Sequence, residues 1–307
     1  MKRPLRKLPL AKQRELDAAV EIIQDGFAKA TSTRRADRLK NGRILKIILF
    51  GSYARGDWVH DPVGRYFSDF DLLVVVDHED LTDFEFWEDI EKRLLAELSA
   101  GAMRTPVSLI VHSLDDVNWK LEHGRGFFID IARDGVALKD TLGVAFSEPQ
   151  PLPPSTALDE ATEYFEEWKE SEAGFARLAA FAITNGDLKH AAFLLHQVAE
   201  TIYQGLLLVL TLYSPKSHNL IRLRNMTEPL EPRLREAWPH DTKFQKRCFE
   251  LLRAAYVKAR YSRHYRITDE ELAYLTERID VLREIVREAC EIRIEELRKA
   301  AGGDSEL

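Results

Sequence analysis

The chain has 307 residues, of which 45% are hydrophobic and 31% charged, and its formal net charge is -7. This hydrophobic content excludes disorder over most of the length, and at roughly 150 residues per domain the length predicts two domains. The acidic balance excludes a surface that binds nucleic acid indiscriminately. We find no run of ~20 apolar residues and no apolar core of a signal peptide, so we expect a cytoplasmic protein with no membrane association. The two distant cysteines, Cys248 and Cys290, are expected to be reduced core residues.

The first half of the chain alternates helical and strand-like segments. Apolar side chains recur at helical spacing over 10–30 and again over 81–98, and both patterns predict amphipathic helices. Apolar runs too short for helices predict buried strands at 44–50, 71–76 and 105–113, with a short edge strand at 135–140. Residues 1–146 are therefore expected to form an α/β (α+β) domain with a small mixed sheet.

The second half shows only helical periodicity. Residues 147–155, SEPQPLPPS, contain four prolines and predict a linker. Beyond it, a period of 3.6 predicts long helices over 156–183, 187–212, 242–265 and 268–300, with shorter helical pieces around 218–237. Thr268, followed by three acidic residues, is expected to cap the last helix. Residues 156–307 are therefore expected to form an all-α helical bundle.

Two short motifs at the ends of the predicted strands indicate chemistry. Gly51 and Ser52 follow the first strand, where a glycine allows close approach of a ligand and a serine offers hydroxyl and amide donors to phosphate. Asp69 and Asp71 stand two apart at the start of the next strand, so their carboxylates project from one face. Such a pair repels unless a cation lies between them, and Mg²⁺ binds carboxylates, water and nucleotide phosphates together. Either motif alone is compatible with an ordinary turn, but together they predict a phosphate cradle facing a metal site.

The motifs LFGSYARG and SDFDLLVVV resemble the nucleotidyltransferase signature shared with DNA polymerase β, and most closely the minimal nucleotidyltransferases, over about residues 40–140. The resemblance implies transfer of a nucleoside monophosphate from an NTP, expected to be ATP, with Mg²⁺ or Mn²⁺ as the metal. Gly51 and Ser52 would hold the β and γ phosphates, and Asp69 and Asp71 would be the catalytic metal ligands. Arg55 would add positive charge to the triphosphate site.

The sequence departs from that family pattern in two places. The spacer before Asp69 is long, and its DWVHDPVGRY segment at 57–66 is interpreted as a lid or a loop that contacts the acceptor. The family usually places a third carboxylate on a later strand, where this chain has Ser108, and a hydroxyl does not replace a carboxylate as a base at neutral pH. Asp77 or His112 could substitute, although both are also compatible with turn or surface roles.

The helical half resembles the HEPN domain over about 156–300, through HAAFLLHQVAETIYQGLLLVL and AAYVKARYSRHY. HEPN nucleases carry an Arg and a His separated by four to six residues; here Arg260 and His264 are separated by three. They could act together on one helix, or could only bind phosphate. By resemblance to paired toxin–antitoxin modules, Tyr265 or Tyr261 could be a site of nucleotidyl modification, or a packing residue. The interval 243–266 has eight Lys or Arg against one Glu and could bind RNA.

The histidines at 190, 196 and 218 lack the close spacing of metal ligands and are interpreted as helix histidines with satisfied hydrogen bonds. The whole chain is thus predicted to be a nucleotidyltransferase whose HEPN domain binds acceptor or nucleotide and forms a homodimer. The alternatives are an RNA-cleaving or RNA-binding, toxin-like protein regulated by the fused transferase, and a silent nucleotide-binding regulator. The sequence does not identify the acceptor, which could be a protein, an RNA or a small molecule, and it does not identify the NTP.

Overall fold

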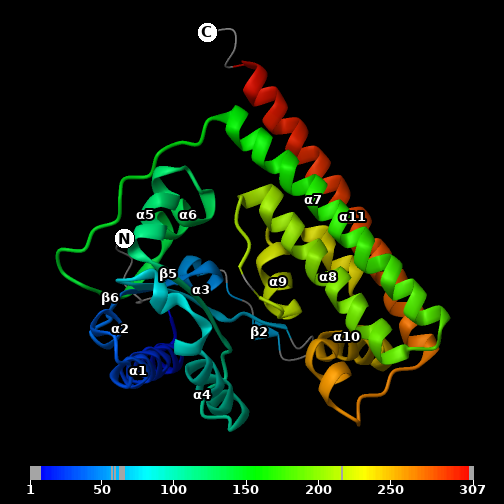
Figure 1. The fold of residues 1–307 in the computed structure, drawn as a ribbon, viewed down its shortest axis with the longest axis horizontal. Coiled ribbons are helices and arrows are strands. Elements are labelled where there is room, and N and C mark those ends of the chain that lie inside the picture. The colour runs from blue at the N-terminus through cyan, green and yellow to red at the C-terminus, as the bar shows by residue number, and fades with distance from the viewer. Residues whose placement is uncertain (1–7, 57, 59, 62–65, 216, 304–307) are drawn as a thin grey trace. The chain divides into compact units, whose positions relative to one another are not determined.

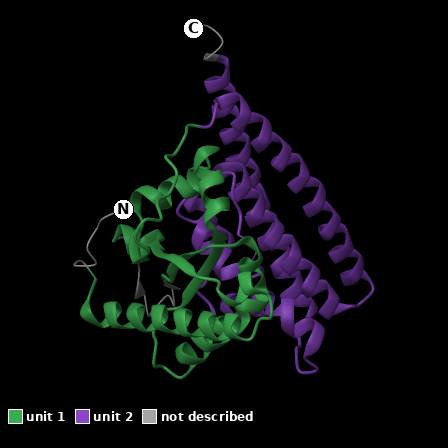
Figure 2. Cartoon of the chain, turned by 60° about the vertical axis from the view of Figure 1, so that its left-hand side comes forward, with its two compact units in different colours: residues 1–151 green, residues 152–307 purple. Residues whose placement is uncertain are grey.

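In the computed structural model, residues 8–56, 58, 60–61, 66–215 and 217–303 are described. The chain divides into two compact units, residues 1–151 and residues 152–307 (Figure 2). A small mixed sheet lies in the first unit and the second is helical, which confirms the predicted fold class (Figure 1). The assignment of 1–146 and 156–307 to two domains joined by a linker at 147–155 stays a prediction.

The first unit is built on four strands in the order β5-β4-β1-β6. Their bounds are Ile44–Phe50 (β1), Phe70–Val76 (β4), Val107–Ser113 (β5) and Val136–Asp140 (β6). β1 runs antiparallel to β4 and β6, whereas β4 and β5 are parallel. β1 and residues 72–76 of β4 are buried throughout, as expected for short apolar runs at the centre of a sheet. The four strands predicted from the sequence are confirmed, with ends within two residues.

Helices and turns cover this sheet and connect its strands. The helices are Leu10–Ser32 (α1), Asp37–Lys40 (α2), Gly51–Arg55 (α3), Glu88–Ser99 (α4), Leu114–Glu122 (α5) and Gly126–Asp134 (α6). Two short antiparallel strands, His60–Asp61 (β2) and Tyr66–Phe67 (β3), form a separate two-stranded ribbon. The helix predicted at 81–98 is shorter than expected, because two 3-10 turns, Glu79–Thr82 and Phe84–Phe86, precede α4. Helices α5 and α6 were not predicted.

The buried face of α1 shows why the apolar spacing of 10–30 gives a helix. Leu16, Ala19, Ile23 and Phe27 are at most 4% exposed and belong to one core cluster with the sheet residues. The ring of Phe27 stacks on Trp87, with 5.3 Å between the ring centres. Burial of the larger side chains, Leu16, Ile23 and Phe27, stabilises the fold by roughly 1.5–3 kcal/mol each, so α1 is fixed against the sheet by its apolar stripe rather than by helix propensity alone.

In its described residues the second unit consists of four long helices and two shorter elements. Their bounds are Pro154–Thr184 (α7), Leu188–Thr211 (α8), Leu220–Thr227 (α9), a 3-10 segment Pro232–Ala237 (η4), Lys243–Tyr261 (α10) and Asp269–Gly303 (α11). The predicted helix at 242–265 ends earlier, at Tyr261. The predicted cap of the last helix is confirmed, since the Glu271 N–H donates to the Thr268 hydroxyl at 3.2 Å and the Thr268 N–H donates to the Glu271 carboxylate at 2.9 Å.

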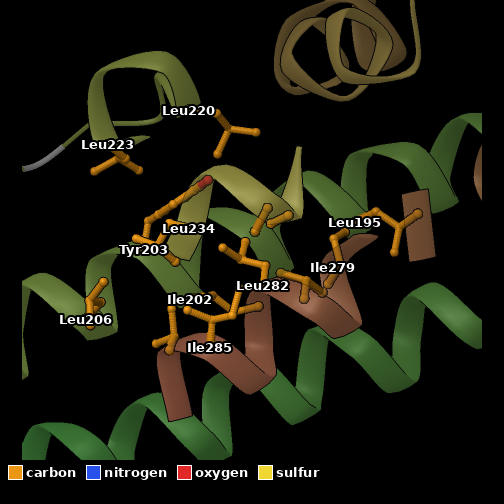
Figure 3. Packing of buried hydrophobic residues seen from close by; sticks show 14 of the residues in the cluster. Leu195, Ile202, Tyr203, Leu206, Leu220, Leu223, Leu234, Ile279, Leu282 and Ile285 are labelled. Carbon is orange, nitrogen blue, oxygen red and sulfur yellow. The ribbon is translucent and has the colours of Figure 1, made fainter. Parts of the chain in front are cut away.

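Helix α8 lies at the centre of the helical core. Figure 3 shows Ile202, Tyr203 and Leu206 of α8 among the apolar side chains of α11 and the 3-10 segment. A Cβ atom at Gly205 would lie 2.4 Å from the Trp168 ring, so glycine allows α7 and α8 to pack closely here. By length and composition α8 could also cross a membrane, but 61% of its most apolar window is buried within the protein, as in the core helix of a bundle.

Both cysteines are free and buried in this core, as predicted. Burial raises the pKa of the Cys248 thiol to about 11 and that of the Cys290 thiol to about 12. Neither is therefore a reactive thiolate near neutral pH.

Candidate functional site

The glycine that follows β1 lies against the second aspartate of the DFD motif. Gly51 opens α3 with φ of +70°, a conformation that favours glycine. A Cβ atom placed there would lie 2.4 Å from Oδ2 of Asp71. The antiparallel pairing of β1 with β4 places Phe50 opposite Asp71, and so brings Gly51 to this carboxylate. The two motifs, separated by 20 positions in the sequence, therefore meet at one end of the sheet.

Ser108 of β5 completes this end of the sheet. Its Cα is the register partner of Asp71, and its hydroxyl donates a hydrogen bond of 2.8 Å to Oδ2 of Asp69. Residues two apart on an extended chain project from the same side, as Asp69 and Asp71 do. Ser108 is hydrogen-bonded to Asp69 and lies opposite Asp71, so the three polar side chains lie on one face of the sheet. Asp69 and Ser108 are each 8% exposed. A buried carboxylate is thus held by a hydroxyl from the neighbouring strand.

This donor set fits a hard divalent cation. Mg²⁺ takes carboxylate, water and phosphate oxygens, and Asp69 and Asp71 would supply the carboxylate oxygens. In the described part of the chain no group of three or more His, Cys, Asp and Glu residues could hold a metal ion. From the described residues, a cation bound at this site would take carboxylate oxygens from Asp69 and Asp71, and water and substrate oxygens would add to its shell.

The position of the family's third carboxylate is occupied by Ser108, and the two suggested substitutes lie elsewhere. Asp77 follows the opposite end of β4, where it accepts hydrogen bonds from the Arg43 backbone and side chain at 2.9 and 3.0 Å. His112 is four residues along β5 from Ser108, about 13 Å at ~3.3 Å per residue. Neither can act beside Asp69 and Asp71, so both suggestions are wrong.

His112 instead belongs to a surface network. Its Nδ1 is 2.6 Å from Oδ2 of Asp116, and Lys120 donates to Oδ1 of Asp116 at 2.8 Å. Burial alone would raise the pKa of Asp116, but the hydrogen bonds from His112 and Lys120 outweigh it and lower this pKa to about 2. The network is structural and joins β5 to α5.

Ser52 and Arg55 lie on the short helix α3, one turn apart and therefore on the same side. Ser52 is half-buried and Arg55 is exposed. The intervening Tyr53 is buried, stacks on Trp58 with 5.2 Å between ring centres, and contacts Phe70. Burial raises the pKa of the Tyr53 hydroxyl, and the nearby Asp69 charge adds to this effect. Tyr53 was not predicted as a site residue, although it directly follows Ser52 in the sequence. Its role is to anchor α3 against the sheet.

Close to Tyr53, hydrogen bonds between α1 and the segment before β5 join these two parts of the first unit. Thr105 is 2% exposed and donates to Glu15 at 2.7 Å, and the Thr105 N–H donates to the same carboxylate oxygen at 2.9 Å. Burial tends to raise the pKa of Glu15, but these hydrogen bonds and Lys12 lower it overall.

The segment 57–66 was predicted to be a lid or a loop that contacts the acceptor. Residues 57, 59 and 62–65 of this segment lie outside the described residues, so this interpretation stays a prediction.

In the helical unit, the structure does not place Arg260 and His264 on one helix. Arg260 lies in the last turn of α10, which ends at Tyr261, and His264 is exposed in the following turn. Tyr265 is only 4% exposed and its hydroxyl donates to the Leu251 carbonyl at 2.9 Å. Burial raises the pKa of the Tyr265 hydroxyl. The helical Arg260–His264 arrangement is therefore wrong, because the chain turns after Tyr261 to bury Tyr265.

The fold and the site define a nucleotidyltransferase domain followed by a HEPN domain. A family model described as "Nucleotidyltransferase domain" matches residues 32–100, and one described as "HEPN domain" matches residues 165–291. The chain belongs to the nucleotidyltransferase family and carries a C-terminal HEPN domain, which confirms the resemblance noted from the motifs.

One relative supports this assignment over most of its own length. It is a Methanocaldococcus jannaschii protein named "Putative protein adenylyltransferase MJ0604". The two sequences are 40% identical over 93 residues, which is 27% of this chain and 78% of the relative. The match supports a transferase of nucleotidyl groups.

Proposed function

We propose that the protein is a Mg²⁺-dependent nucleotidyltransferase that transfers AMP from ATP to a hydroxyl group of a protein, an RNA or a small molecule. The observation that carries the proposal is the contact of Gly51 with Asp71, on the same face as the Asp69–Ser108 hydrogen bond. These contacts bring the phosphate motif and the paired carboxylates together at one end of the sheet. The adenylyltransferase name of the similar protein favours AMP as the transferred group.

Each residue of the site has a role that follows from its chemistry. Gly51 lets the backbone approach the polyphosphate, and Ser52 offers its hydroxyl and N–H to phosphate oxygens. Arg55, one turn later, adds positive charge for the same phosphates. A bound Mg²⁺ would neutralise charge on the transferring phosphate. Ser108 fixes the orientation of Asp69 and, being a hydroxyl, adds no negative charge beside the two carboxylates.

A protein acceptor within the chain itself would be Tyr261 rather than Tyr265. Tyr261 is 76% exposed, whereas Tyr265 is buried and its hydroxyl is hydrogen-bonded. A hydroxyl must reach the α-phosphate to be modified, and the buried one cannot do so without local unfolding. We propose Tyr261 as the site of self-modification or of modification by a second copy.

The HEPN domain is proposed to bind the acceptor or nucleotide, to mediate a homodimer and to offer α10 to RNA. Several α10 cations, including Lys243, Lys246 and Lys258, have no carboxylate partner in the described part of the chain, which supports a polyanionic ligand. We also propose a cytoplasmic location, in line with the buried position of the apolar helix α8.

Incubation with Mg²⁺ and each radiolabelled NTP in turn tests the transfer reaction. We expect covalent label from ATP on protein or RNA, and loss of at least about 100-fold in Asp69→Asn. The intact mass of protein purified from cells would identify any nucleotidyl unit already attached. Nucleotide binding without label on any acceptor tried would instead favour the silent regulator, and RNA breakdown unaffected by Asp69→Asn would favour the toxin-like alternative.

A further inference from the structure

The last strand of the first unit leaves one edge of the sheet open. In the strand order β5-β4-β1-β6, β6 pairs with β1 on one side, and no described strand pairs with it on the other (Figure 1). Residues 137–139 of β6 are half-buried and Asp140 is exposed. An edge of this kind carries backbone N–H and C=O groups that can pair with a further extended segment.

A groove of about 300 Å³ lies between this open edge and α1. Val20 of α1 and both Ala137 and Leu138 of β6 supply its apolar lining. Leu138 also packs against the core cluster that α1 shares with the sheet. The groove is therefore bounded by a helix and a strand that the core holds in place.

The segment that follows β6 is held on the other face of the sheet. Ile47 of β1 belongs to the core cluster beneath α1, so the adjacent Lys46 projects from the opposite face. The Lys46 ammonium is paired with Asp140 and donates to the Val144 carbonyl. These contacts draw the segment after β6 away from α1, and the groove beside the edge stays open.

Three carboxylates of α1 line the same groove. Asp17, Glu21 and Asp25 are exposed and recur every four residues, so they lie on one side of the helix. In the described part of the chain none of these carboxylates forms an ion pair or a side-chain hydrogen bond, although Arg14 and Lys29 flank them on α1. Like charges four residues apart destabilise a helix, and a bound cation relieves this repulsion.

We propose that the groove binds an extended basic segment of a partner protein, which adds as a strand beside β6 and directs lysine or arginine side chains toward the α1 carboxylates. Alternate residues of a strand lie ~6.6 Å apart on one face, and residues four apart on a helix lie ~6 Å apart along its axis. Basic side chains at alternate positions therefore match the spacing of neighbouring carboxylates.

The lining of the groove favours this partner over others. Its apolar side chains suit the methylene stems of lysine and arginine, while the charged heads reach the carboxylates. Its negative charge disfavours RNA and other phosphate-bearing ligands. A small polycation would use the carboxylates but not the backbone groups of β6. The proposed docking site does not depend on the transfer activity proposed above.

The probe is a fluorescently labelled, amidated peptide of four Lys-Thr repeats, added to the full-length protein at low ionic strength and followed by fluorescence anisotropy. We expect saturable binding. The double variant Asp17→Asn with Glu21→Gln should bind at least about fivefold more weakly, because two exposed ion pairs are lost. The matched control, Asp115→Asn with Glu122→Gln, removes the same groups from exposed positions of α5 and should change the affinity less than about twofold.

Hydrogen exchange of residues 136–140, measured by mass spectrometry, reports the strand pairing. The Lys-Thr peptide should slow exchange there. A peptide of four Lys-Pro repeats has the same charge but lacks every second N–H, so it should bind at least about fivefold more weakly and leave this exchange unchanged. Thermal denaturation of each variant confirms that it is folded, as expected for substitutions at exposed positions.

The proposal is overturned if the Lys-Thr peptide does not bind, or if the α5 control weakens binding as much as the α1 variant. It also fails if both peptides bind alike without protecting β6. Spermine that binds as tightly as the Lys-Thr peptide would assign the carboxylates to small polycations instead. Protection of β6 that rises with protein concentration alone would assign the open edge to a second copy of the chain, and either result contradicts the proposal.

Discussion

Replacing Ser108 by alanine removes one hydroxyl from the proposed transfer site and leaves the strand backbone unchanged. The lost hydroxyl is the 2.8 Å donor to Oδ2 of Asp69, and both residues are 8% exposed. Water can therefore replace this donor only in part. A hydrogen bond to a charged group contributes about 1.5–3 kcal/mol, so we expect the free energy of unfolding of the first unit to fall by about 2 kcal/mol.

For a unit of 151 residues, each kcal/mol lowers the thermal midpoint by roughly 2–4 °C, so the expected decrease is about 4–8 °C. The assay is thermal denaturation followed by circular dichroism at neutral pH. Ser108→Thr is the matched control, since threonine keeps the hydroxyl and suits a strand. An unchanged midpoint in Ser108→Ala would refute the reasoning that this hydroxyl holds a buried carboxylate. A decrease of the same size in both variants would show that packing, and not the hydrogen bond, is responsible.

The remaining predictions concern the glycine, a surface carboxylate and the two tyrosines. Gly51→Ala should displace the Asp71 carboxylate, whose oxygen would be 2.4 Å from the new Cβ, and reduce nucleotidyl transfer by about 100-fold; unchanged transfer kinetics would contradict this. Asp116→Asn should lower the free energy of unfolding by about 2 kcal/mol in urea denaturation at pH 7. A pKa lowered from 3.8 to about 2 stabilises the folded state above pH 4, and this contribution is lost as the pH falls through 2, so the difference should be only a few tenths of a kcal/mol (~0.4) at pH 2 and should vanish below it. Tyr261→Phe should abolish any self-modification seen by peptide mass mapping, whereas modification lost only in Tyr265→Phe would reverse that assignment.

The sequence was sufficient for the sheet and for the family of the first domain, because both depend on local patterns. The apolar runs and the Gly-Ser and Asp-Phe-Asp motifs each lie within a few consecutive residues. Their contact was not visible, since the approach of Gly51 to Asp71 requires the antiparallel register of β1 with β4. The bond from Ser108 to Asp69 likewise requires the parallel register of β4 with β5.

The helical unit shows more clearly what the hydrophobic periodicity of the sequence cannot predict. Tyr265 follows Tyr261 by four residues and fits the continuing helical pattern, yet the chain leaves the helix so that Tyr265 can be buried. The pairing of Glu200 with His218 joins a helix to a segment 18 residues later, and no spacing rule identifies such a contact. His196, in contrast, is the buried histidine with satisfied hydrogen bonds that the sequence indicated.

The most direct test of the proposed transfer site compares two aspartates of one strand segment. Asp71→Asn removes a carboxylate beside Gly51, whereas Asp77→Asn removes one just beyond the opposite end of β4, where Asp77 pairs with Arg43. In a transfer assay with Mg²⁺ and labelled ATP, we predict that Asp71→Asn loses at least about 100-fold in rate and that Asp77→Asn keeps nearly the full rate. Equal activity of Asp71→Asn and the unmodified protein would contradict the assignment of nucleotidyl transfer to this end of the sheet.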